Sequence, residues 1–349
     1  MSLNFLITGG CGFIGSEAVR QISDLGHNVY NIDNLSYASS EESLTNISTS
    51  NYNFFKCNIA DKNGVKEFIS KAQPNYILNF AAESHVDRSI DGPEDFIQTN
   101  IVGTYNLLNE SLSYYYSLPL EDKSSFKFIH ISTDEVYGSL DFNDKAFSEL
   151  DPFRPNSPYS ASKASSDLLV RAWNKTFDFP AIITHSSNNY GPWQYPEKLI
   201  PLTVSNALKG NPIEIYGKGL NVRDWIFVKD HVEALLNIAF DGAIGETYNI
   251  GSNFEISNID LVERIIATLT KFEAPKDGFY NDLITFVEDR PGHDLRYALN
   301  TNKITKELSW SPKVDIEEGL EITIKWMLSN KEWLLNKSKD HMRLGLKKK

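Results

Sequence analysis

The sequence predicts an α/β fold, with a doubly wound parallel sheet followed by a smaller C-terminal α/β lobe, on three observations. A short apolar strand, Leu3–Thr8, ends in the glycine-rich turn Gly9–Gly15, and a helical pattern follows at once. Apolar strands and amphipathic helices then alternate along the chain, which favours parallel strands joined by helical crossovers. After residue 190 this alternation breaks. We therefore expect a Rossmann-type sheet in residues 1–190 and a second lobe beyond them.

The length agrees with this division. A chain of 349 residues is long enough for two domains, or for one large domain with a smaller lobe. We expect residues 220–252 to return to the first domain, residues 191–335 to form mainly the second lobe, and residues 336–349 to form a basic, flexible tail. Residues 331–349 carry seven basic and two acidic side chains. We interpret this excess as a solvated terminus, ahead of a membrane or partner contact.

Charge and cysteine content argue against several classes of protein. The formal net charge is −12, so the chain has no electrostatic footprint for nucleic acid. Its two cysteines, Cys11 and Cys57, form neither a disulfide framework nor a metal-ligand pattern, and we expect no metal. The apolar run Phe5–Ile7 is too short for a signal peptide or a membrane span. The interpretation is a cytoplasmic protein without a membrane contact.

The first strand–turn–helix unit has the features of a dinucleotide site. Glycines at 9, 12 and 15 let the backbone approach a pyrophosphate, and the helix that follows offers free N–H groups. The next strand ends at Asp33, 18 residues after Gly15. A carboxylate there can accept both ribose hydroxyls and repels a 2′-phosphate, so NAD is favoured over NADP. A loop or cap aspartate is the alternative for Asp33.

A hydroxyl and two carboxylates follow the buried run Phe126–Ile131 as Thr133, Asp134 and Glu135. The carboxyl edge of an open α/β sheet is where ligands bind. Further along, Tyr159 and Lys163 are four residues apart on a predicted helix and share one face. An ammonium beside a phenol lowers the tyrosine pKa and makes it a usable base. For the triplet, a polar loop or a helix cap is the alternative.

For two further predicted helices, the sequence indicates which side chains pack against the core or against another helix. We expect Asp95–Ser113 to be a helix whose Ile97, Ile101, Tyr105 and Leu108 face the core, and the tyrosines 114–116 to lie in a loop. Small residues on the helix from Ser157 to about Phe177, such as Ala161 and Ala172, permit close helix approach, including across a dimer.

Together these motifs resemble the extended short-chain dehydrogenase/reductase superfamily. Within it the chain resembles the nucleotide-sugar 4,6-dehydratases from about residue 3 to residue 335, most closely those acting on dTDP-glucose in deoxysugar biosynthesis. The specific stretches are Ala81–Ile90, Ser132–Gly138, Ser157–Trp173, Ser187–Pro201 and Arg290–Asp294. The Asp134–Glu135 pair discriminates, because epimerases of the superfamily lack it. The resemblance implies bound NAD, a homodimer and a nucleotide-sugar-binding second lobe.

The resemblance also implies roles. In that family NAD⁺ oxidises the sugar at C4, water is lost across C5 and C6, and the same NADH reduces C6. Tyr159, assisted by Lys163, would remove the O4 proton while Thr133 orients O4. Glu135 would remove the C5 proton, and Asp134 would protonate the departing O6. One carboxyl must then be protonated and its neighbour ionised, and the sequence leaves open which holds the proton.

Matching positions give the expected contacts. NAD would be held by Gly9, Gly12, Phe13, Ile14, Gly15, Asp33, Asn58, Ile59, Ala81, Ala82, Tyr159, Lys163 and Asn189. The nucleotide sugar would be held by Ser84, Thr133, Asn188, Glu197, Lys198, Leu199, Arg223, Arg290 and His293. The family usually has Asp where this chain has Asn58, whose amide oxygen can still accept a hydrogen bond from the adenine amino group. The lead-in His185–Ser187 also differs slightly, and we attach no consequence to it.

Alternatives stay open at this point. UDP-glucose could replace dTDP-glucose, because an apolar pocket discriminates one methyl group by only ~1–3 kcal/mol. A nucleotide-sugar 4-epimerase is disfavoured by the acid pair, since epimerisation needs no acid or base at C5 and C6. A non-catalytic NAD-binding regulator would be expected to have lost Tyr159, Lys163 or the acids, and all are present. For Arg223, a surface ion pair with Asp224 or another neighbouring residue is the alternative to a ligand contact.

Overall fold

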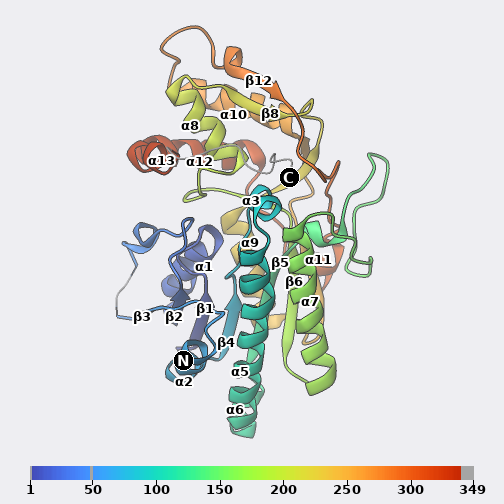
Figure 1. Cartoon of the computed structure of the whole chain (residues 1–349). Helices are drawn as coiled ribbons and strands as arrows, with labels where there is room; N and C mark the ends of the chain where they lie inside the picture. The colour runs from blue at the N-terminus through green and yellow to red at the C-terminus, as the bar shows by residue number, and fades with distance from the viewer. Residues whose placement is uncertain (1, 48–49, 339–349) are drawn as a thin grey trace.

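The computed structural model describes residues 2–47 and 50–338 (Figure 1). Most of the predicted tail, from residue 339 on, lies outside the described residues. The centre of the molecule is a seven-stranded parallel sheet, here called the large sheet, in the order β10-β6-β5-β4-β1-β2-β3. Its strands are β1 (Asn4–Thr8), β2 (Asn28–Asp33), β3 (Tyr52–Lys56), β4 (Tyr76–Asn79), β5 (Lys127–Thr133), β6 (Ala181–Ser186) and β10 (Thr247–Ile250). The predicted α/β fold is confirmed.

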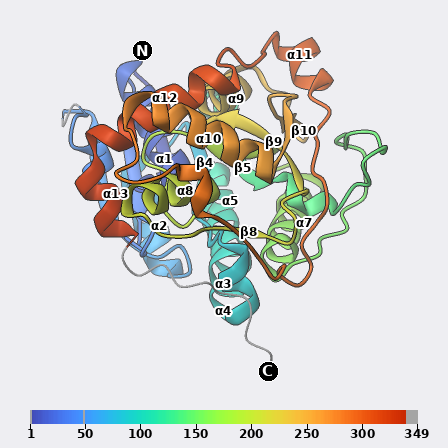
Figure 2. The same cartoon turned by 90° about the horizontal axis from the view of Figure 1, so that it is seen from above.

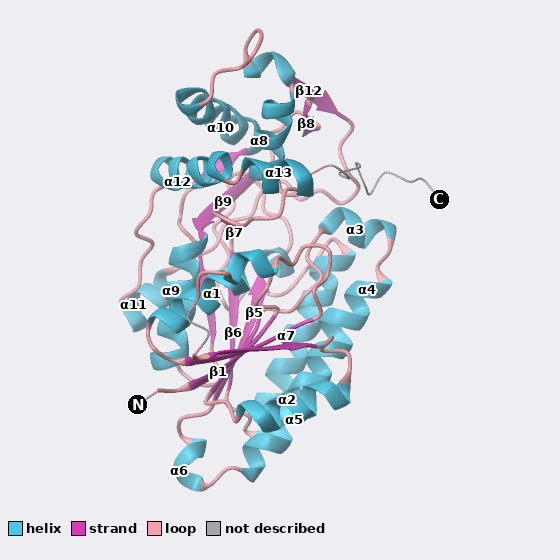
Figure 3. Cartoon of the chain, turned by 90° about the vertical axis from the view of Figure 1, so that its left-hand side faces the viewer, coloured by secondary structure: helices cyan, strands magenta, loops and turns pink. Residues whose placement is uncertain are grey.

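Helices cover both faces of the large sheet (Figure 3). One face carries α1 (Phe13–Asp24), α9 (Val228–Asp241) and α11 (Asn302–Leu308); the other carries α2 (Lys62–Ala72), α5 (Thr104–Ser117) and α7 (Pro158–Phe177). Successive residues of a strand point to opposite faces, so Phe5 and Ile7 join one buried cluster and Leu6 the other. The short helices are α3 (Val86–Asp91), α4 (Glu94–Phe96) and α6 (Leu120–Lys123).

The strand order reverses beside β1. The chain moves from β1 outward to β2 and β3, then returns to place β4, β5 and β6 on the other side. Loops leaving β1 and β4 therefore diverge at the carboxyl edge and leave a crevice between them, which is where ligands bind in such sheets. The glycine turn after β1 and the Ala81–Ala82 segment after β4 both lie at this crevice.

The smaller lobe lies over that carboxyl edge (Figures 1 and 2). It has its own buried cluster, which includes Ile200, Ile265 and Leu320. Its elements are α8 (Leu199–Lys209), β8 (Ile213–Tyr216), β11 (Glu255–Ser257), α10 (Asn258–Phe272), β12 (Ile284–Val287), α12 (Ile316–Ser329) and α13 (Lys331–Lys337). Between lobe and large sheet, β7 (Asn188–Tyr190), β9 (Val222–Phe227) and β11 form a three-stranded mixed sheet.

Residues 220–252, which we expected to return to the first domain, divide between the three-stranded sheet and the large sheet. Strand β9 pairs with β7 and β11, whereas α9 packs on α1 and β10 pairs with β6 at the edge of the large sheet. The division of the chain into domains at residue 190 stays a prediction. In the part of the chain that the structure describes, no helix has both the length and the apolar character needed to cross a bilayer.

One predicted helix differs from the structure. Asp95–Ser113 is not a uniform α-helix, because α4 passes into a π-helical stretch, Ile97–Gly103, before α5 begins. The wider turn changes which side chains face inward. Ile97 is 48% exposed and Tyr105 42% exposed, so the prediction that both belong to the core is wrong. The tyrosines 114–116, expected in a loop, lie in the last turn of α5.

Candidate active site

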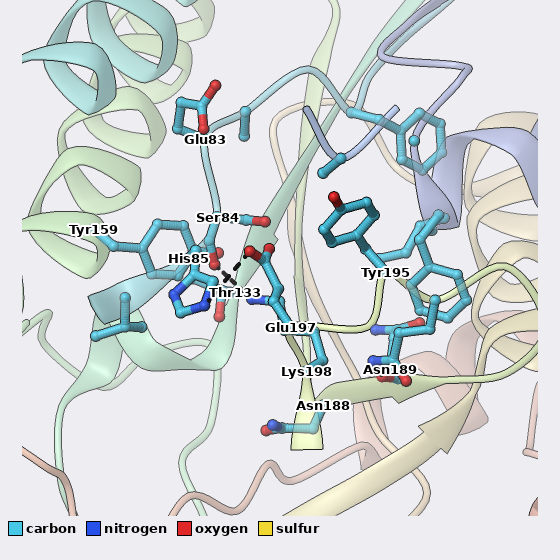
Figure 4. Close-up of a pocket in the computed structure, with 18 of the residues that line it drawn as sticks. Glu83, Ser84, His85, Thr133, Tyr159, Asn188, Asn189, Tyr195, Glu197 and Lys198 are labelled. Atoms are coloured by element: carbon cyan, nitrogen blue, oxygen red, sulfur yellow. Dashed lines mark hydrogen bonds and ion pairs between the residues drawn. The ribbon is translucent and has the colours of Figure 1, made fainter. Parts of the chain in front are cut away.

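A cavity of about 480 Å³ lies where the carboxyl edge of the large sheet meets the lobe. This volume is in the range of small-molecule sites. It is lined by every residue to which the sequence assigned a contact or a catalytic role: Gly9, Gly12, Phe13, Ile14, Gly15, Asp33, Asn58, Ile59, Ala81, Ala82, Ser84, Thr133, Asp134, Glu135, Tyr159, Lys163, Asn188, Asn189, Glu197, Lys198, Leu199, Arg223, Arg290 and His293. Figure 4 shows Thr133, Tyr159, Asn188 and Lys198 around one space. The individual roles stay predictions.

The turn after β1 fits a dinucleotide. Gly9 has φ +73°, and a Cβ added to Gly15 would lie 2.2 Å from the Gly9 carbonyl oxygen, so glycine is needed at both positions. Asp33, at the end of β2, is buried and accepts hydrogen bonds from Cys11 N at 2.9 Å and Leu35 N at 2.7 Å. The carboxylate thus orders this turn while lining the cavity, which suits a contact with ribose hydroxyls.

The side chain of Asn58, which was expected to accept a hydrogen bond from adenine, already accepts one from its own chain. Its side-chain oxygen accepts a hydrogen bond from Ala60 N at 2.9 Å, so one of its two lone pairs is used in a local turn. The second lone pair remains for the adenine amino group.

Thr133 ends β5, and a 3₁₀ helix, Asp134–Tyr137, follows at once. The Thr133 hydroxyl accepts a hydrogen bond from Glu135 N at 3.3 Å and donates to Asp134 Oδ1 at 3.2 Å. Thr133 is therefore the N-cap of this 3₁₀ helix and also lines the cavity, so the two interpretations of the triplet are compatible. The cap fixes both acids at the strand end, where they face the cavity.

The two acids have different electrostatic surroundings. Burial and the neighbouring Glu135 carboxylate raise the pKa of Asp134 well above its ordinary value. Burial also raises the pKa of Glu135, but Arg290, Arg223 and Lys198 act in the opposite direction. These cations favour the ionised form of Glu135, so Asp134 is the better proton holder.

Tyr159 and Lys163 project from the first turns of α7. That helix starts with a capping box of Ser157 and Ser160, and with Pro158 in its first turn. Both site residues are buried, and Lys163 Nζ donates to the Ile131 carbonyl oxygen at 2.8 Å. Burial lowers the pKa of Lys163 to about 8, which Asp167 opposes.

The Tyr159 pKa does not follow the sequence argument. Burial and the Glu135 carboxylate raise it, and a hydrogen bond with the Thr133 side chain only partly compensates. The lowering that the sequence argument expects from Lys163 is not observed in this structure. The nearby acids favour the protonated phenol, whereas positive charge near the ring would favour the phenolate.

Sequence analysis missed a buried network beneath the site. Asp167 lies one turn after Lys163 on α7 and is 1% exposed. Its carboxylate accepts a hydrogen bond from Ser132 Oγ at 2.9 Å and lies 3.1 Å from His185 Nε2 and 3.3 Å from His130 Nε2. The hydrogen bond with His185 and the close approach of His130 hold the pKa of Asp167 far below its usual range despite burial. The unusual His185 therefore has a structural partner, although the motif gave no signal of it.

A second missed group surrounds Glu197 at the wall of the cavity (Figure 4). Glu197 Oε1 accepts a hydrogen bond from Tyr37 at 3.0 Å, and its Oε2 lies 3.5 Å from both His85 Nε2 and Arg88 Nε. Arg88 stacks over the Tyr37 ring at 3.8 Å. Lys198 donates to the Ser84 carbonyl oxygen at 2.9 Å. These contacts join the lobe to the segment after β4.

The cationic side of the cavity comes mainly from the lobe. Arg223 is buried and donates to the Asp294 carbonyl oxygen at 2.9 Å, whereas Asp224 binds Ser252, so the predicted alternative of an Arg223–Asp224 ion pair is not observed. Arg290 is 2.7 Å from Asp87 Oδ1. His293 lies 2.6 Å from Asp289. Two arginines facing one cavity suit an anionic ligand.

Comparison with known proteins identifies the family. Residues 6–323 match the model of the family described as GDP-mannose 4,6 dehydratase. The chain belongs to this family. The dTDP-glucose 4,6-dehydratase of Haemophilus influenzae is 50% identical over 333 residues, which cover 94% of this chain and 98% of that relative. The enzyme of the same name from Neisseria meningitidis serogroup B is 49% identical over 97% of this chain and 98% of its own.

Solved structures of this dehydratase family and of related enzymes share the fold. DesIV, a dTDP-glucose 4,6-dehydratase from Streptomyces venezuelae with NAD and TYD bound, is 39% identical with a TM-score of 0.85, covering 94% of this chain and 98% of its own. A UDP-glucose 4-epimerase from Thermotoga maritima with UDP-glucose is 28% identical with a TM-score of 0.82, covering 94% and 99%. The fold is thus common to dehydratases and epimerases, and the site must separate them.

The buried histidines predict sensitivity to acid. Burial lowers the pKa of His231, whose Nδ1 lies 2.8 Å from Asn189 Oδ1, to about 3, and that of His130 to about 4. Since the unfolded values are near 6.5, the unfolded chain binds more protons below that pH, and stability falls as pH falls. Each histidine should cost roughly 2 kcal/mol of unfolding free energy between pH 7.5 and pH 5.

Urea unfolding at both pH values measures this loss. His231→Gln should remove about one histidine's share of it. His27→Gln is the matched control, because His27 is only partly buried, and it should keep most of the loss. An equal pH dependence in wild type and His231→Gln would contradict the prediction.

Proposed function

We propose that the protein is an NAD-dependent dehydratase that converts dTDP-glucose to dTDP-4-keto-6-deoxyglucose and water. The observation that carries this proposal is the placement of Thr133, Asp134 and Glu135 at one strand end beside Tyr159, with the two acids in different electrostatic surroundings. Near 50% identity over almost the full length to enzymes of this name supports the choice of substrate.

The site residues then divide the work. NAD⁺, when bound, would supply the hydride acceptor for C4 and the hydride donor for C6. Tyr159 removes the O4 proton, and Thr133 orients O4. The C4 ketone acidifies the C5 proton, which Glu135 removes as the general base. Asp134, protonated by virtue of its raised pKa, gives its proton to O6 as water departs.

The remaining residues fit a nucleotide sugar with many hydroxyls and a diphosphate. Arg223, Arg290 and His293 would contact the diphosphate and nucleoside. Residues near the sugar would be Ser84, Asn188, Glu197, Lys198 and Leu199. The glycine turn, Asp33 and the Ala81–Ala82 segment would hold NAD. A cytoplasmic location follows the same family expectation.

Two alternatives stay on the same fold. UDP-glucose is the competing substrate, because the two nucleotides differ at the base and in the ribose 2′-hydroxyl rather than at the reacting sugar. A 4-epimerase is disfavoured by Asp134 and Glu135, which have no use when only C4 reacts.

Separate incubation with dTDP-glucose and UDP-glucose, followed by detection of a 4-keto-6-deoxy product, tests the function. Absence of product from both, with NAD bound, would contradict it.

Glu135→Gln separates the steps. The amide keeps the size of the side chain but cannot take the C5 proton, so water loss should fall by about 10²-fold or more. Oxidation at C4 should persist, and NADH should accumulate at 340 nm. Loss of NADH formation with later steps intact would show that Glu135 acts elsewhere.

We also propose a homodimer formed through α5 and α7, which lie side by side at one surface (Figure 1). Leu168 on α7 is 56% exposed, and Ile97 and Tyr105 before and on α5 are also exposed. Tyr105 packs against Trp173 of α7, with ring centroids 6.0 Å apart. Apolar side chains beside the small Ala161 and Ala172 on two long helices suit a second copy of the same chain.

A charge on this surface should separate the subunits. Leu168→Lys should weaken dimerisation by about 100-fold or more, because it buries an unpaired ammonium. Leu150→Lys is the control, since Leu150 is 95% exposed and lies outside both helices. Sedimentation velocity at micromolar concentration distinguishes the variants. A monomeric wild type, or an unchanged Leu168→Lys dimer, would refute the arrangement.

A further inference from the structure

The proposed function, on which this inference rests, leaves one proton on the wrong residue at the end of each catalytic cycle. Over one cycle Tyr159 gains the O4 proton, and Asp134 loses a proton to the departing hydroxyl. Glu135 takes the C5 proton and returns it to C5 when hydride reaches C6. The enzyme therefore ends with its total proton number unchanged, but with one proton on Tyr159 that must be on Asp134 before the next cycle.

Exchange with bulk water is restricted at these positions. Asp134 is 2% exposed, and Thr133 and Tyr159 are each 8% exposed. Asp134 Oδ2 is buried and makes no hydrogen bond to any described residue. Within the described chain, the Asp134 carboxyl group therefore has one hydrogen bond, from Thr133 to Oδ1. A route inside the protein would reset the acid without opening the cavity.

Thr133 has the geometry of such a route. Its hydroxyl donates to Asp134 Oδ1 at 3.2 Å. Its oxygen accepts from Glu135 N at 3.3 Å, which leaves one lone pair for another donor. The Tyr159 phenol is hydrogen-bonded to this side chain. Figure 4 shows the Tyr159 ring reaching from α7 toward Thr133. Because Thr133 donates to Asp134 and keeps a free lone pair, it can accept a hydrogen bond from the phenol, and the hydrogen bonds can then run from phenol to hydroxyl to carboxylate.

We propose that Thr133 relays the proton from Tyr159 to Asp134 after each turnover. The Tyr159 O–H bond breaks as an O–H bond forms at Thr133 Oγ1, and the original Thr133 O–H bond breaks as one forms at Asp134 Oδ1. A half-turn of the carboxyl group then brings the proton to its other side. The Glu135 carboxylate raises the pKa values of both Asp134 and Tyr159, so the direction of the transfer would come from positive charge near the phenol, such as the nicotinamide of bound NAD⁺.

The relay predicts that Thr133 matters more for repeated turnover than for the first one. Thr133→Val keeps the shape but removes the hydroxyl, and Thr133→Ser restores the hydroxyl. Single-turnover rates, with enzyme in excess, report O4 oxidation and dehydration. Steady-state rates also include the reset. Circular dichroism and retention of NAD check that both variants fold.

In Thr133→Val the steady-state rate should fall at least tenfold further than the single-turnover rate, giving a burst of about one product per site. A small acid such as imidazolium should raise its steady-state rate and leave the burst unchanged. Thr133→Ser should keep the two rates in their wild-type ratio. Equal losses of both rates in Thr133→Val, complete loss included, would assign Thr133 to O4 alone and overturn the relay. No product from wild type would instead overturn the proposed function.

Discussion

The arrangement of the site depends on one buried carboxylate, that of Asp167. Asp167 lies on α7, and its carboxylate contacts Ser132 and His130 of β5 and His185 of β6. Thr133 directly follows Ser132, and Lys163 precedes Asp167 by one helical turn. A single anion thus fixes the strand that carries the acids against the helix that carries the tyrosine. An isolated buried carboxylate would be costly, but two hydrogen bonds and the nearby His130 ring offset its desolvation.

A second constraint comes from the lobe, which supplies the positive charge. Arg223 and Arg290 both favour an ionised Glu135, and Arg290 depends on a contact that crosses from the lobe to α3. Arg290 is held by Asp87 of α3, and Asp87 also accepts a hydrogen bond from Tyr216 of β8 at 2.9 Å. The protonation of the acid pair is therefore coupled to how the lobe sits on the large sheet. Displacing the lobe would remove the cations and bring the two pKa values closer together.

The residues that the sequence predicts for the site line one cavity, because strong local rules act on them. The glycine turn requires positive φ and close backbone approach, and the parallel sheet brings the ends of β1, β2, β4 and β5 to one edge. The helix cap at Ser157 fixes the start of α7 and thus the face shared by Tyr159 and Lys163.

The misses involve contacts between residues far apart in sequence. His130 and His185 gave no local signal, because their common partner Asp167 is reached only after β5, β6 and α7 have packed. The helix expected over Asp95–Ser113 was misjudged because a π-helical stretch shifts the phase on which periodicity arguments depend. The raised pKa of Tyr159 follows from its burial and from the nearby Glu135 and Asp134 carboxylates, neither of which can be predicted from the i,i+4 spacing with Lys163.

The fold by itself does not decide between dehydration and epimerisation. A UDP-glucose 4-epimerase superposes with a TM-score of 0.82 at 28% identity, so sheet, lobe and cavity are compatible with both chemistries. Epimerisation needs a proton acceptor only at O4. Dehydration also needs a base at C5 and an acid at O6, in opposite protonation states within one short segment. Under the proposed function Asp134 and Glu135 would meet that demand, because burial and the Glu135 carboxylate raise the pKa of Asp134, whereas Arg290 and Arg223 favour the ionised form of Glu135.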